Sequence, residues 1–374
     1  MQSPDLQGKR VLIVIARLNK GGTAQYLEEL TVGLQRAGLT VCVATGFVQG
    51  LEIEADSVAN LPVARIPSLG RRISPIRDLK ARHELQALVD EFKPDLIYTH
   101  TFKAGLIGRT LRRRVKLIHA FHGHLLTEPE LQGFRRPIVI LIERLLASRA
   151  ERLVTVGKRV AEELLEVGIG RPSQYQSIAP GVRPITLEDR ATVRSEFKFA
   201  NDTRPVVAWL ARVTAVKAPH RVVELAQSIP GAIFVQAGGG DLLNQLKKEP
   251  PIENWHLLGW QPATKIWAIA DIAISTSENE GMPVALIEAQ LAGIPAVALD
   301  VGSVAEVIRS GETGFVLKQW NQEFIERLSE LVDSNQLRAQ FGHNARNRAI
   351  EEFKPERLIN EHIKLFQSVL NSGG

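Results

Sequence analysis

The sequence predicts an α/β protein built from two doubly wound parallel-sheet domains. Short apolar runs alternate with amphipathic stretches along all 374 residues, as expected when strands alternate with helices. The runs are apolar throughout, which is typical of parallel strands buried on both faces. The alternation breaks between residues 179 and 205, where the turn cluster Ala179–Pro184 and a charged stretch intervene. At roughly 100–200 residues per domain, the length also favours two domains.

The first half reads as strand and helix in turn. Its predicted strands are Val11–Ala16, Val41–Thr45, Leu96–Tyr98, Val115–Ala120 and Arg152–Val156. Its predicted helices are Thr23–Ala37, which Gly38 ends, Leu79–Glu91 and Ile138–Ala150. The segment 133–152 mixes aliphatic residues with arginine. We favour a buried domain helix there over a helix lying on a membrane interface.

The second half restarts the same alternation. Its predicted strands are Pro205–Leu210, Ala232–Gln236, His256–Leu258, Ile272–Ser275, Ala296–Leu299 and Gly314–Leu317. Its predicted helices include Arg221–Gln227, one near Leu242–Lys248 and one from Pro283 to Gly293. Domain boundaries of 1–180 and 181–354 follow. Because ligands sit beyond the carboxyl ends of strands in such sheets, we expect a cleft between the domains to hold the substrate.

Composition excludes several classes of protein. A single cysteine, Cys42, rules out an internal disulfide framework and a cysteine-based zinc site. The polar start and short first apolar run fit neither a signal peptide nor a membrane span. We therefore expect a soluble cytoplasmic protein.

Charge is uneven along the chain. Residues 1–180 carry 26 basic and 18 acidic side chains, and residues 181–374 carry 20 and 23. The excess lies in Arg71–Arg82 and Arg109–Lys116, which suggests an anionic partner such as a lipid surface or lipid phosphate, with a solvated face as the alternative. Nucleic acid is disfavoured, because the basic stretches lack interleaved aromatic residues and any recognised binding motif.

Two glycine or histidine loops in the first half follow predicted strands. Gly21, Gly22 and Thr23 precede a helix, where paired glycines can present amides to an anion. The alternative is an ordinary turn with Thr23 as the helix N-cap. Residues 119–124 (HAFHGH) hold three histidines without the spacing of a metal site. We interpret them as a loop that contacts substrate hydroxyls, with at least one structural histidine.

The second half carries the charged candidates. Arg212 and Lys217 follow a predicted strand and suit a diphosphate, although loop solubility would also explain them. Gly238, Gly239 and Gly240 close the next strand and leave room for a ligand against the backbone.

The strongest signal is the segment 277–288. Glu280 and Gly281 form a turn after a strand, and Pro283 occupies the expected first helical position. The helix start would offer amides to phosphate. Glu288 would lie about two turns below, so that both carboxylates face the ligand. The spacing of Ser303 and Glu306 predicts only a capping box.

Taken together, these segments resemble the retaining nucleotide-sugar glycosyltransferases of family 4, over nearly the whole chain. The matching pieces are Gly21-Gly22-Thr23, the HAFHGH loop, Arg212 with Lys217, Gly238–Gly240, Leu258-Gly259-Trp260, Glu280 with Glu288, and the stretch 291–317. Ser303 departs from the pattern, since many members have a second glycine there. The resemblance implies the GT-B fold, in which two Rossmann-like domains face each other across a cleft.

The resemblance also implies a role for each matching residue. Arg212 and Lys217 would hold the donor diphosphate, Glu280 the donor sugar and Glu288 the ribose. His122 would contact the sugar from the first domain. The catalytic set is thus Arg212, Lys217, Glu280 and His122, and the remaining donor-binding residues are Gly238, Gly239, Gly240, Gly259, Gly281, Met282, Pro283, Val284 and Glu288. Gly21, Gly22 and Thr23 would line the acceptor and phosphate side, and helix 355–374 would pack back on the first domain.

The implied activity is that of a retaining hexosyltransferase in cell-surface polysaccharide or glycoconjugate synthesis. A UDP- or GDP-sugar would be the donor, a glycan or lipid-linked molecule the acceptor, and no cofactor or metal would be needed. The chain lacks any Asp-x-Asp, the common metal-bridging device. The expected location is the cytoplasm, with peripheral contact at the inner membrane face left open. The alternatives are a sugar-nucleotide epimerase and a non-catalytic, membrane-associated nucleotide-sugar-binding protein; a dehydrogenase is disfavoured by the missing G-x-G-x-x-G.

Overall fold

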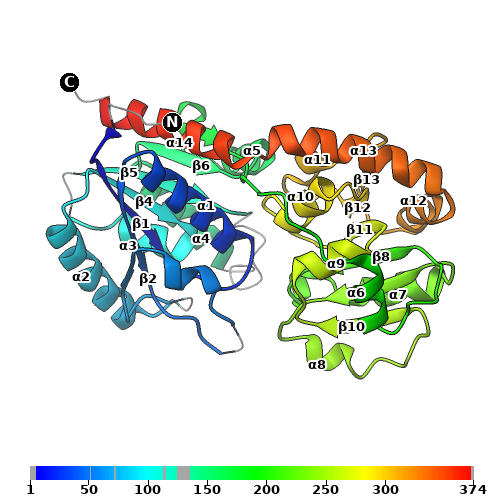
Figure 1. Cartoon of the computed structure of the whole chain (residues 1–374). Helices are drawn as coiled ribbons and strands as arrows, with labels where there is room; N and C mark the ends of the chain where they lie inside the picture. Colours follow the sequence, from blue (N-terminus) through cyan, green and yellow to red (C-terminus); the bar gives the residue numbers. More distant parts are fainter. Residues whose placement is uncertain (1–5, 51, 71–72, 113–114, 124–134, 372–374) are drawn as a thin grey trace. The chain divides into compact units, whose positions relative to one another are not determined.

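A computed structural model describes residues 6–50, 52–70, 73–112, 115–123 and 135–371. The chain divides into two compact units (Figure 1). The first comprises Met1–Gly181 with Pro355–Gly374, and the second comprises Val182–Lys354. The chain therefore leaves the first unit once and returns to it through its last helix.

The described residues of the first unit form one sheet in the order β3-β2-β1-β4-β5-β6-β7, with every neighbouring pair parallel. The strands are β1 (Arg10–Ile15), β2 (Thr40–Thr45), β3 (Val63–Arg65), β4 (Leu96–His100), β5 (Lys116–Phe121), β6 (Arg152–Thr155) and β7 (Tyr175–Ser177). The strand order reverses between β1 and β4, which makes the carboxyl ends of these two strands the expected ligand edge.

Both faces of this sheet are covered by helices. These are α1 (Gly22–Arg36), α2 (Pro75–Phe92), α3 (Thr101–Gly108), α4 (Arg135–Ala147), α5 (Lys158–Glu166) and α14 (Pro355–Asn371), with short 3-10 turns at Asp56–Asn60 and Pro172–Gln174. Alternate residues of β1 enter different cores, as the period of two in a strand requires. Ile13 packs with α1 and α14, whereas Leu12 packs with α2 to α5.

In the second unit, the described residues form a sheet in the order β10-β9-β8-β11-β12-β13, again with parallel pairs. The strands are β8 (Val206–Leu210), β9 (Ile233–Ala237), β10 (Trp255–Gly259), β11 (Ile272–Ser275), β12 (Ala296–Leu299) and β13 (Gly314–Leu317). The helices are α6 (Arg190–Glu196), α7 (His220–Ser228), α8 (Leu243–Leu246), α9 (Ala263–Ile269), α10 (Val284–Leu291), α11 (Val304–Val307), α12 (Gln322–Asp333) and α13 (Asn335–Glu352), with a 3-10 turn at Ala215–Lys217. Two parallel-sheet α/β domains are therefore confirmed.

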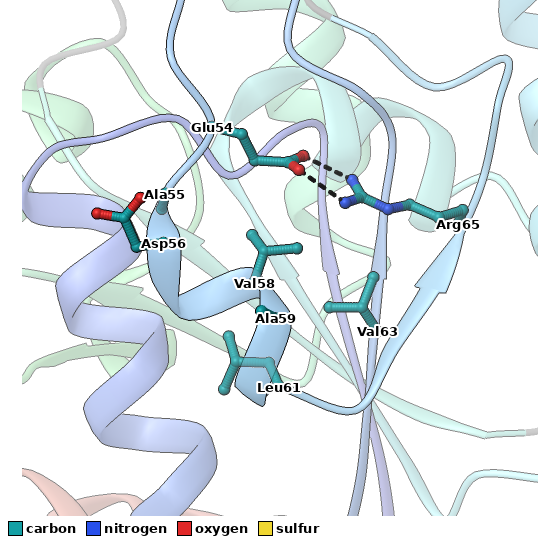
Figure 2. A pocket seen from close by; sticks show the side chains of 8 residues that line it. All are labelled: Glu54, Ala55, Asp56, Val58, Ala59, Leu61, Val63 and Arg65. Atoms are coloured by element: carbon teal, nitrogen blue, oxygen red, sulfur yellow. Dashed lines mark hydrogen bonds and ion pairs between the residues drawn. The ribbon is translucent and has the colours of Figure 1, made fainter.

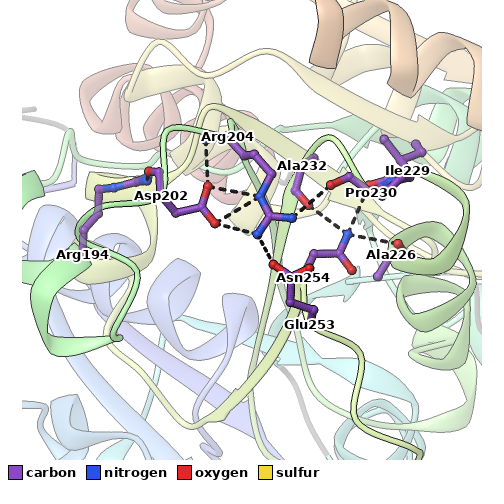
Figure 3. Close-up of polar contacts among 9 residues, drawn as sticks. All are labelled: Arg194, Asp202, Arg204, Ala226, Ile229, Pro230, Ala232, Glu253 and Asn254. Atoms are coloured by element: carbon purple, nitrogen blue, oxygen red, sulfur yellow. Dashed lines mark hydrogen bonds and ion pairs between the residues drawn. The ribbon is translucent and has the colours of Figure 1, made fainter.

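A polar network ties the strand entrances of the second unit together (Figure 3). The Arg204 guanidinium lies between the carboxylates of Asp202 and Glu253, at N–O distances of 2.6 and 2.8 Å. The buried Asn254 amide donates to the carbonyls of Ala226, Ile229 and Ala232 in the figure. Since two of these carbonyls belong to the end of α7 and its cap, Asn254 satisfies groups that the helix leaves unpaired.

Helix starts differ from the sequence prediction at three places. Helix α1 begins at Gly22 with Gly21 as its N-cap, so Thr23 is inside the helix. Pro283 is the N-cap of α10 rather than its first residue, because its ψ of 106° is extended. Ser303 caps α11 without a side-chain hydrogen bond, so the capping box is wrong. The buried Ser303 hydroxyl has no hydrogen-bond partner in the described structure, which leaves the first turn of α11 without a side-chain cap.

Helix α4 is not buried all round. Val139, Leu146 and Ala147 are buried against the sheet, whereas Ile138, Leu141 and Leu145 are exposed by 54, 57 and 65%. The expected buried domain helix is therefore buried on one face only. Its outer face exposes aliphatic side chains to solvent.

Candidate active site

The candidate site of the second unit lies where its strand order reverses. Strand β8 pairs with β9 on one side and with β11 on the other. The loops that leave β8 and β11 therefore emerge next to each other, at the position where open α/β sheets bind ligands. Lys217 is on the first of these loops and Glu280 is on the second.

Lys217 and Glu280 form an ion pair. The Lys217 Nζ to Glu280 Oε1 distance is 2.6 Å, and the side chains are only 16 and 11% exposed. A pair so poorly hydrated interacts more strongly than one on the open surface. The structure thus joins two residues that are 63 positions apart and that the sequence assigned to one site.

Threonine and arginine side chains hold the two loops in register. The Thr276 hydroxyl, just after β11, donates to the Lys217 carbonyl at 2.9 Å and accepts from Trp209 Nε1 at 3.0 Å. Arg221 Nη1 donates to the Thr276 carbonyl at 2.9 Å, and its other terminal nitrogen pairs with Glu278 at 3.0 Å. Sequence reasoning missed the roles of Thr276 and Arg221. The feature that could have revealed Thr276 is its place as a polar residue at the carboxyl end of an apolar strand.

Close backbone approach explains two glycines at this edge. A Cβ on Gly238, after β9, would lie 1.8 Å from the Ala211 carbonyl oxygen. A Cβ on Gly302 would lie 1.8 Å from the Glu280 carbonyl oxygen, and the Ser303 amide donates to the Gly281 carbonyl at 2.8 Å. The loop after β12 therefore supports the backbone of Glu280 and Gly281. Ser303, the departure from the family pattern, makes this contact through its main chain.

Helix α10 starts immediately after this loop. The amides of Leu286 and Ile287 donate to the Pro283 carbonyl, so those of Val284 and Ala285 precede the first helical hydrogen bond. Glu288 is buried and accepts from Trp267 Nε1 at 3.3 Å. Because α10 begins at Val284, Glu288 lies about one turn into the helix rather than two.

The other candidates of the second unit also lie at its carboxyl edge. Arg212 is exposed, two residues after β8. Gly239 and Gly240 follow β9, and Gly259 ends β10, where the Gly238 amide donates to the Gly259 carbonyl at 2.7 Å. Met282 is buried and Gly281 partly exposed, between Glu280 and α10.

In the first unit, the corresponding edge holds neutral side chains beside matched ion pairs such as Arg17–Glu52. Gly21 lies after β1 in a left-handed conformation, with φ of 151°, and leads directly into Gly22 and Thr23 of α1. His122 follows β5 and is partly exposed. His119 is fully buried, with its Nδ1 2.8 Å from the Thr99 hydroxyl, and is therefore a structural histidine. His124 and residues 71–72 and 113–114 of the basic stretches lie outside the described residues.

Sequence reasoning missed the neighbours of His122. The His122 Nε2 lies 2.8 Å from Nδ1 of the buried His100, and the Tyr26 ring meets the His122 ring edge-on at 4.8 Å. Burial and the nearby His362 lower the pKa of His122 to about 4, and burial lowers the pKa of His100 well below its usual value. The imidazole of His122 is therefore neutral at pH 7 and can hydrogen-bond without adding charge.

A separate hollow of about 660 Å³ lies at the edge strand β3 (Figure 2). Its walls are Glu54, Ala55, Asp56, Val58, Ala59, Leu61, Val63 and Arg65. The Arg65 guanidinium is held by both oxygens of Glu54, at 2.8 and 2.9 Å. With its cation matched in this way, the hollow offers no excess positive charge to a phosphate, and it lies away from the strand reversal.

Two absences concern the part of the chain that the structure describes. Its His, Cys, Asp and Glu side chains form no group of three or more that could hold a metal ion. None of its helices has the length and apolar character needed to cross a membrane.

Comparisons with known proteins match both units. Residues 21–181 match the glycosyl transferase 4-like domain, and residues 192–348 match the glycosyl transferases group 1 domain. The chain is 24% identical to a UDP-Gal:alpha-D-GlcNAc-diphosphoundecaprenol alpha-1,3-galactosyltransferase of Escherichia coli, over 80% of this chain and 82% of that one. It is 29% identical to a D-inositol 3-phosphate glycosyltransferase of Nocardia farcinica, over 80 and 74%.

Solved structures share the fold over nearly the whole chain. A sucrose-phosphate synthase from Thermosynechococcus elongatus superposes with a TM-score of 0.84 at 18% identity, covering 98% of this chain and 100% of that one. Anabaena Alr3699/HepE in complex with UDP-glucose gives a TM-score of 0.79 at 20% identity, covering 96 and 99%. With two family matches that together span most of its length, the chain belongs to the family 4-type glycosyltransferases of the GT-B fold.

Proposed function

We propose that this glycosyltransferase is a retaining, metal-independent hexosyltransferase that uses a UDP- or GDP-sugar and acts on a glycan or lipid-linked acceptor. The observation that carries the proposal is the largely shielded Lys217–Glu280 pair at the strand reversal of the second unit, beside the start of α10. The E. coli relative uses UDP-Gal, and the Anabaena structure contains UDP-glucose, which supports a UDP-sugar first.

The ion pair suggests how the donor is recognised. Its ammonium would bind the donor diphosphate, and its carboxylate would accept hydrogen bonds from sugar hydroxyls. In the structure, Lys217 and Glu280 bind each other. The donor must therefore break their short contact and replace it with contacts to both side chains. A ligand with only one of the two chemical groups gains less from this exchange, which favours the intact nucleotide-sugar over its fragments.

The departing diphosphate is the part of the reaction that most needs charge stabilisation. As the glycosyl bond breaks, negative charge grows on the nucleotide, and preorganised cations and helix amides stabilise it most effectively in a water-poor site. Lys217, Arg212 and the amides of Val284 and Ala285 supply these groups at one edge of the sheet. The chain lacks an Asp-x-Asp motif. We therefore assign to these residues the role that a metal plays elsewhere.

Glu288 and His122 complete the assignment. The Glu288 carboxylate, oriented by Trp267, would bind the ribose hydroxyls from within α10. The neutral His122 would donate or accept a hydrogen bond at the donor sugar. Retention would proceed by attack from the face of the leaving group, with Gly21, Gly22 and Thr23 on the acceptor and phosphate side.

A donor panel tests the proposal directly. UDP, GDP, ADP and their sugars are added to the protein in a thermal-shift assay, where a ligand at 100 times its Kd stabilises by about 2.7 kcal/mol. We expect one nucleotide-sugar to stabilise more than its free nucleotide. Transfer is then followed with that donor, with and without EDTA. Loss of transfer in EDTA that Mg²⁺ restores would contradict metal independence, and an inverted product anomer would contradict retention.

The relatives named above are glycosyltransferases, and they lend no support to the epimerase or to a non-catalytic protein. The same transfer assay distinguishes these two alternatives from a glycosyltransferase. An epimerase would convert the donor sugar without an acceptor, whereas a non-catalytic protein would bind the donor and release no nucleotide in any acceptor mixture.

We also propose that the protein acts at the inner face of the cytoplasmic membrane, as a peripheral protein. The outer stripe of α4, formed by Ile138, Leu141 and Leu145, repeats at helical spacing and is flanked by the exposed Arg136 and Arg144. Aliphatic side chains between arginines suit an anionic lipid interface. Ile76 and Leu79, exposed by 84 and 55% at the start of α2, add apolar surface on a helix that packs in the same core as α4.

Liposome sedimentation tests the membrane proposal. The protein should bind phosphatidylglycerol vesicles and bind phosphatidylcholine vesicles much more weakly. The double variant Leu141→Glu, Leu145→Glu should lose this binding, whereas Ile350→Glu, an exposed isoleucine of the second unit, should retain it. Equal sedimentation of both variants would remove the assignment of α4.

A further inference from the structure

His362 of the C-terminal helix belongs to a buried cluster at the edge of the first unit. The cluster gathers side chains from four separate segments: Tyr26 of α1, Tyr98 and His100 of β4, His122 after β5, and His362 of α14. Tyr26, Tyr98, His100 and His362 are essentially inaccessible to solvent. Polar groups placed so deeply need defined partners, because an unsatisfied one is costly.

The hydrogen bonds of His362 have a fixed direction. Its Nδ1 lies 2.8 Å from the Leu358 carbonyl, which can only accept, so Nδ1 carries the proton. Burial lowers the pKa of His362 to about 4, so the ring is neutral at pH 7. Its Nε2 is then an acceptor, and it faces the hydroxyls of Tyr26 at 3.1 Å and Tyr98 at 3.2 Å.

Both tyrosine hydroxyls lie within reach of the same acceptor. Burial raises the pKa of both phenols, so both hydroxyls carry their protons at neutral pH. Each hydroxyl is within hydrogen-bond distance of His362 Nε2, so one nitrogen on the last helix positions both hydroxyls.

These tyrosines in turn form the surroundings of His122. The Tyr26 ring packs edge-on against His122, at 4.8 Å and 85°. The Tyr98 ring lies 4.1 Å from that of His100, whose Nδ1 is 2.8 Å from His122 Nε2. Since this contact occupies Nε2, Nδ1 is the ring nitrogen of His122 that remains for a ligand.

We propose that His362 is a positioning residue of the transfer reaction: through the hydroxyls of Tyr26 and Tyr98, and through His100, it orients the His122 ring so that Nδ1 is presented to the donor sugar. The proposal rests on the proposed role of His122. On this proposal, α14, the helix by which the chain returns to its first unit, contributes to the transfer reaction.

The test uses the full-length protein with three variants. His362→Phe removes the acceptor and keeps a ring, and His362→Gln places an amide oxygen where Nε2 lies. Leu365→Ala, a buried residue of the same helix without a polar group, controls for loss of packing. We expect His362→Phe to lower kcat about 10- to 100-fold, the range of a misplaced reacting group. The Kd for UDP should stay within about twofold, and His362→Gln should restore much of kcat.

A pairing experiment separates positioning from packing. If Tyr26 acts through His362, Tyr26→Phe combined with His362→Phe should cost little more than His362→Phe alone. The proposal would be overturned if the kcat losses of Tyr26→Phe and His362→Phe multiplied in the double variant, or if Leu365→Ala lowered kcat as much as His362→Phe. If His362→Phe fails to fold, Tyr26→Phe replaces it in the kcat comparison, because it removes a hydroxyl that lies against His362 Nε2; wild-type kcat in Tyr26→Phe would then overturn the proposal.

A titration of His122 by NMR needs no substrate. The groups that face this part of the cluster are Tyr26, Tyr98, His100, His362 and, on α14, Arg357 and Glu361. The positive charge of a protonated His362 lowers the pKa of His122, so His362→Gln should raise it. An unchanged His122 titration and unchanged ring shifts would contradict the coupling. Wild-type protein without any transfer would instead contradict the proposed function, which keeps the two failures apart.

Discussion

The two strand reversals of this protein are alike in topology and differ in chemistry. In the second unit, the loops that meet there carry a cation and a carboxylate 2.6 Å apart, each largely shielded from solvent. In the first unit, they carry the matched pairs Arg17–Glu52 and Lys103–Asp78 and lie beside neutral imidazoles and phenols. The first unit thus combines ion pairs with a buried cluster of uncharged hydrogen-bonding side chains.

The two environments suit different chemical groups of a ligand. A diphosphate requires fixed positive charge, whereas a hexose presents only neutral hydroxyls, for which a neutral imidazole is a suitable partner. Burial produces both environments. It strengthens the attraction within a matched ion pair, but it drives an unmatched imidazole toward its neutral form.

Acid should break the first unit before the second, and this is the largest effect that we expect. Burial lowers the pKa of His100, His119, His122 and His362. Because the unfolded chain binds protons at pH 6.5 where these folded groups do not, stability is lost as pH falls from about 6.5 towards 4. Protonation linked to His362 alone would lower the free energy of unfolding by about 2 kcal/mol at pH 5.

Hydrogen exchange at pH 7 and at lower pH, corrected for intrinsic rates, reads the two units separately. In the second unit, His256 is the histidine whose pKa burial lowers, so its strands should remain protected longer than β4 and β5. Loss of protection in both units at the same pH would contradict the contrast. His362→Gln should reduce the acid sensitivity of the first unit.

Removing the cations should cost nearly as much, but in turnover. Lys217→Ala and Arg212→Ala are each expected to lower kcat by about 10²–10³, the scale of one preorganised transition-state contact. The variants should retain their melting temperature to within a few degrees. Near-normal turnover in both would reject the charged edge as the place where the leaving group is stabilised.

Much of this arrangement could be predicted from the sequence, because its signals are local. Apolar runs located the central strands, and the sheet topology then brought Lys217 and Glu280 together as expected. The short edge strands β3 and β7 escaped prediction, since three residues give no reliable periodicity. The helix starts at Gly22 and Val284 also differed, because the backbone angles of a cap depend on the loop before it.

The neighbours of His122 could not be predicted in the same way. His362 lies 240 positions from His122. Its spacing from Leu358, Leu365 and Val369 places it on the apolar face of its helix, but nothing local shows which side chains of other segments it meets. Tyr98 and His100 were more accessible to reasoning, since they end an apolar strand as His119 and Phe121 do. Applying one rule to every strand end would have included them.

Glu280→Gln sharpens the contrast within the charged edge. The amide keeps the shape and can still contact sugar hydroxyls, but it removes the charge that matches Lys217. We expect transfer to fall by about 10- to 100-fold, as for loss of hydrogen bonds to a charged group. Binding of UDP should be unchanged or tighter, because Lys217 no longer has a competing carboxylate. Calorimetry with UDP and with the sugar nucleotide measures both, and equal weakening of the two would contradict a sugar-specific role.

The smallest expected effect concerns Trp267, which orients Glu288 without itself reaching the site. Its indole N–H donates to Glu288 Oε2 at 3.3 Å, and both side chains are buried. Trp267→Phe keeps most of the packing and removes one donor, worth about 1 kcal/mol or about fivefold. If Glu288 binds the ribose, this loss should appear in the Kd of the nucleoside diphosphate and leave kcat at saturating donor nearly unchanged. A fall in kcat with unchanged Kd would instead assign Glu288 to the reacting sugar, and the division of labour between the two carboxylates of the second unit would have to be reversed.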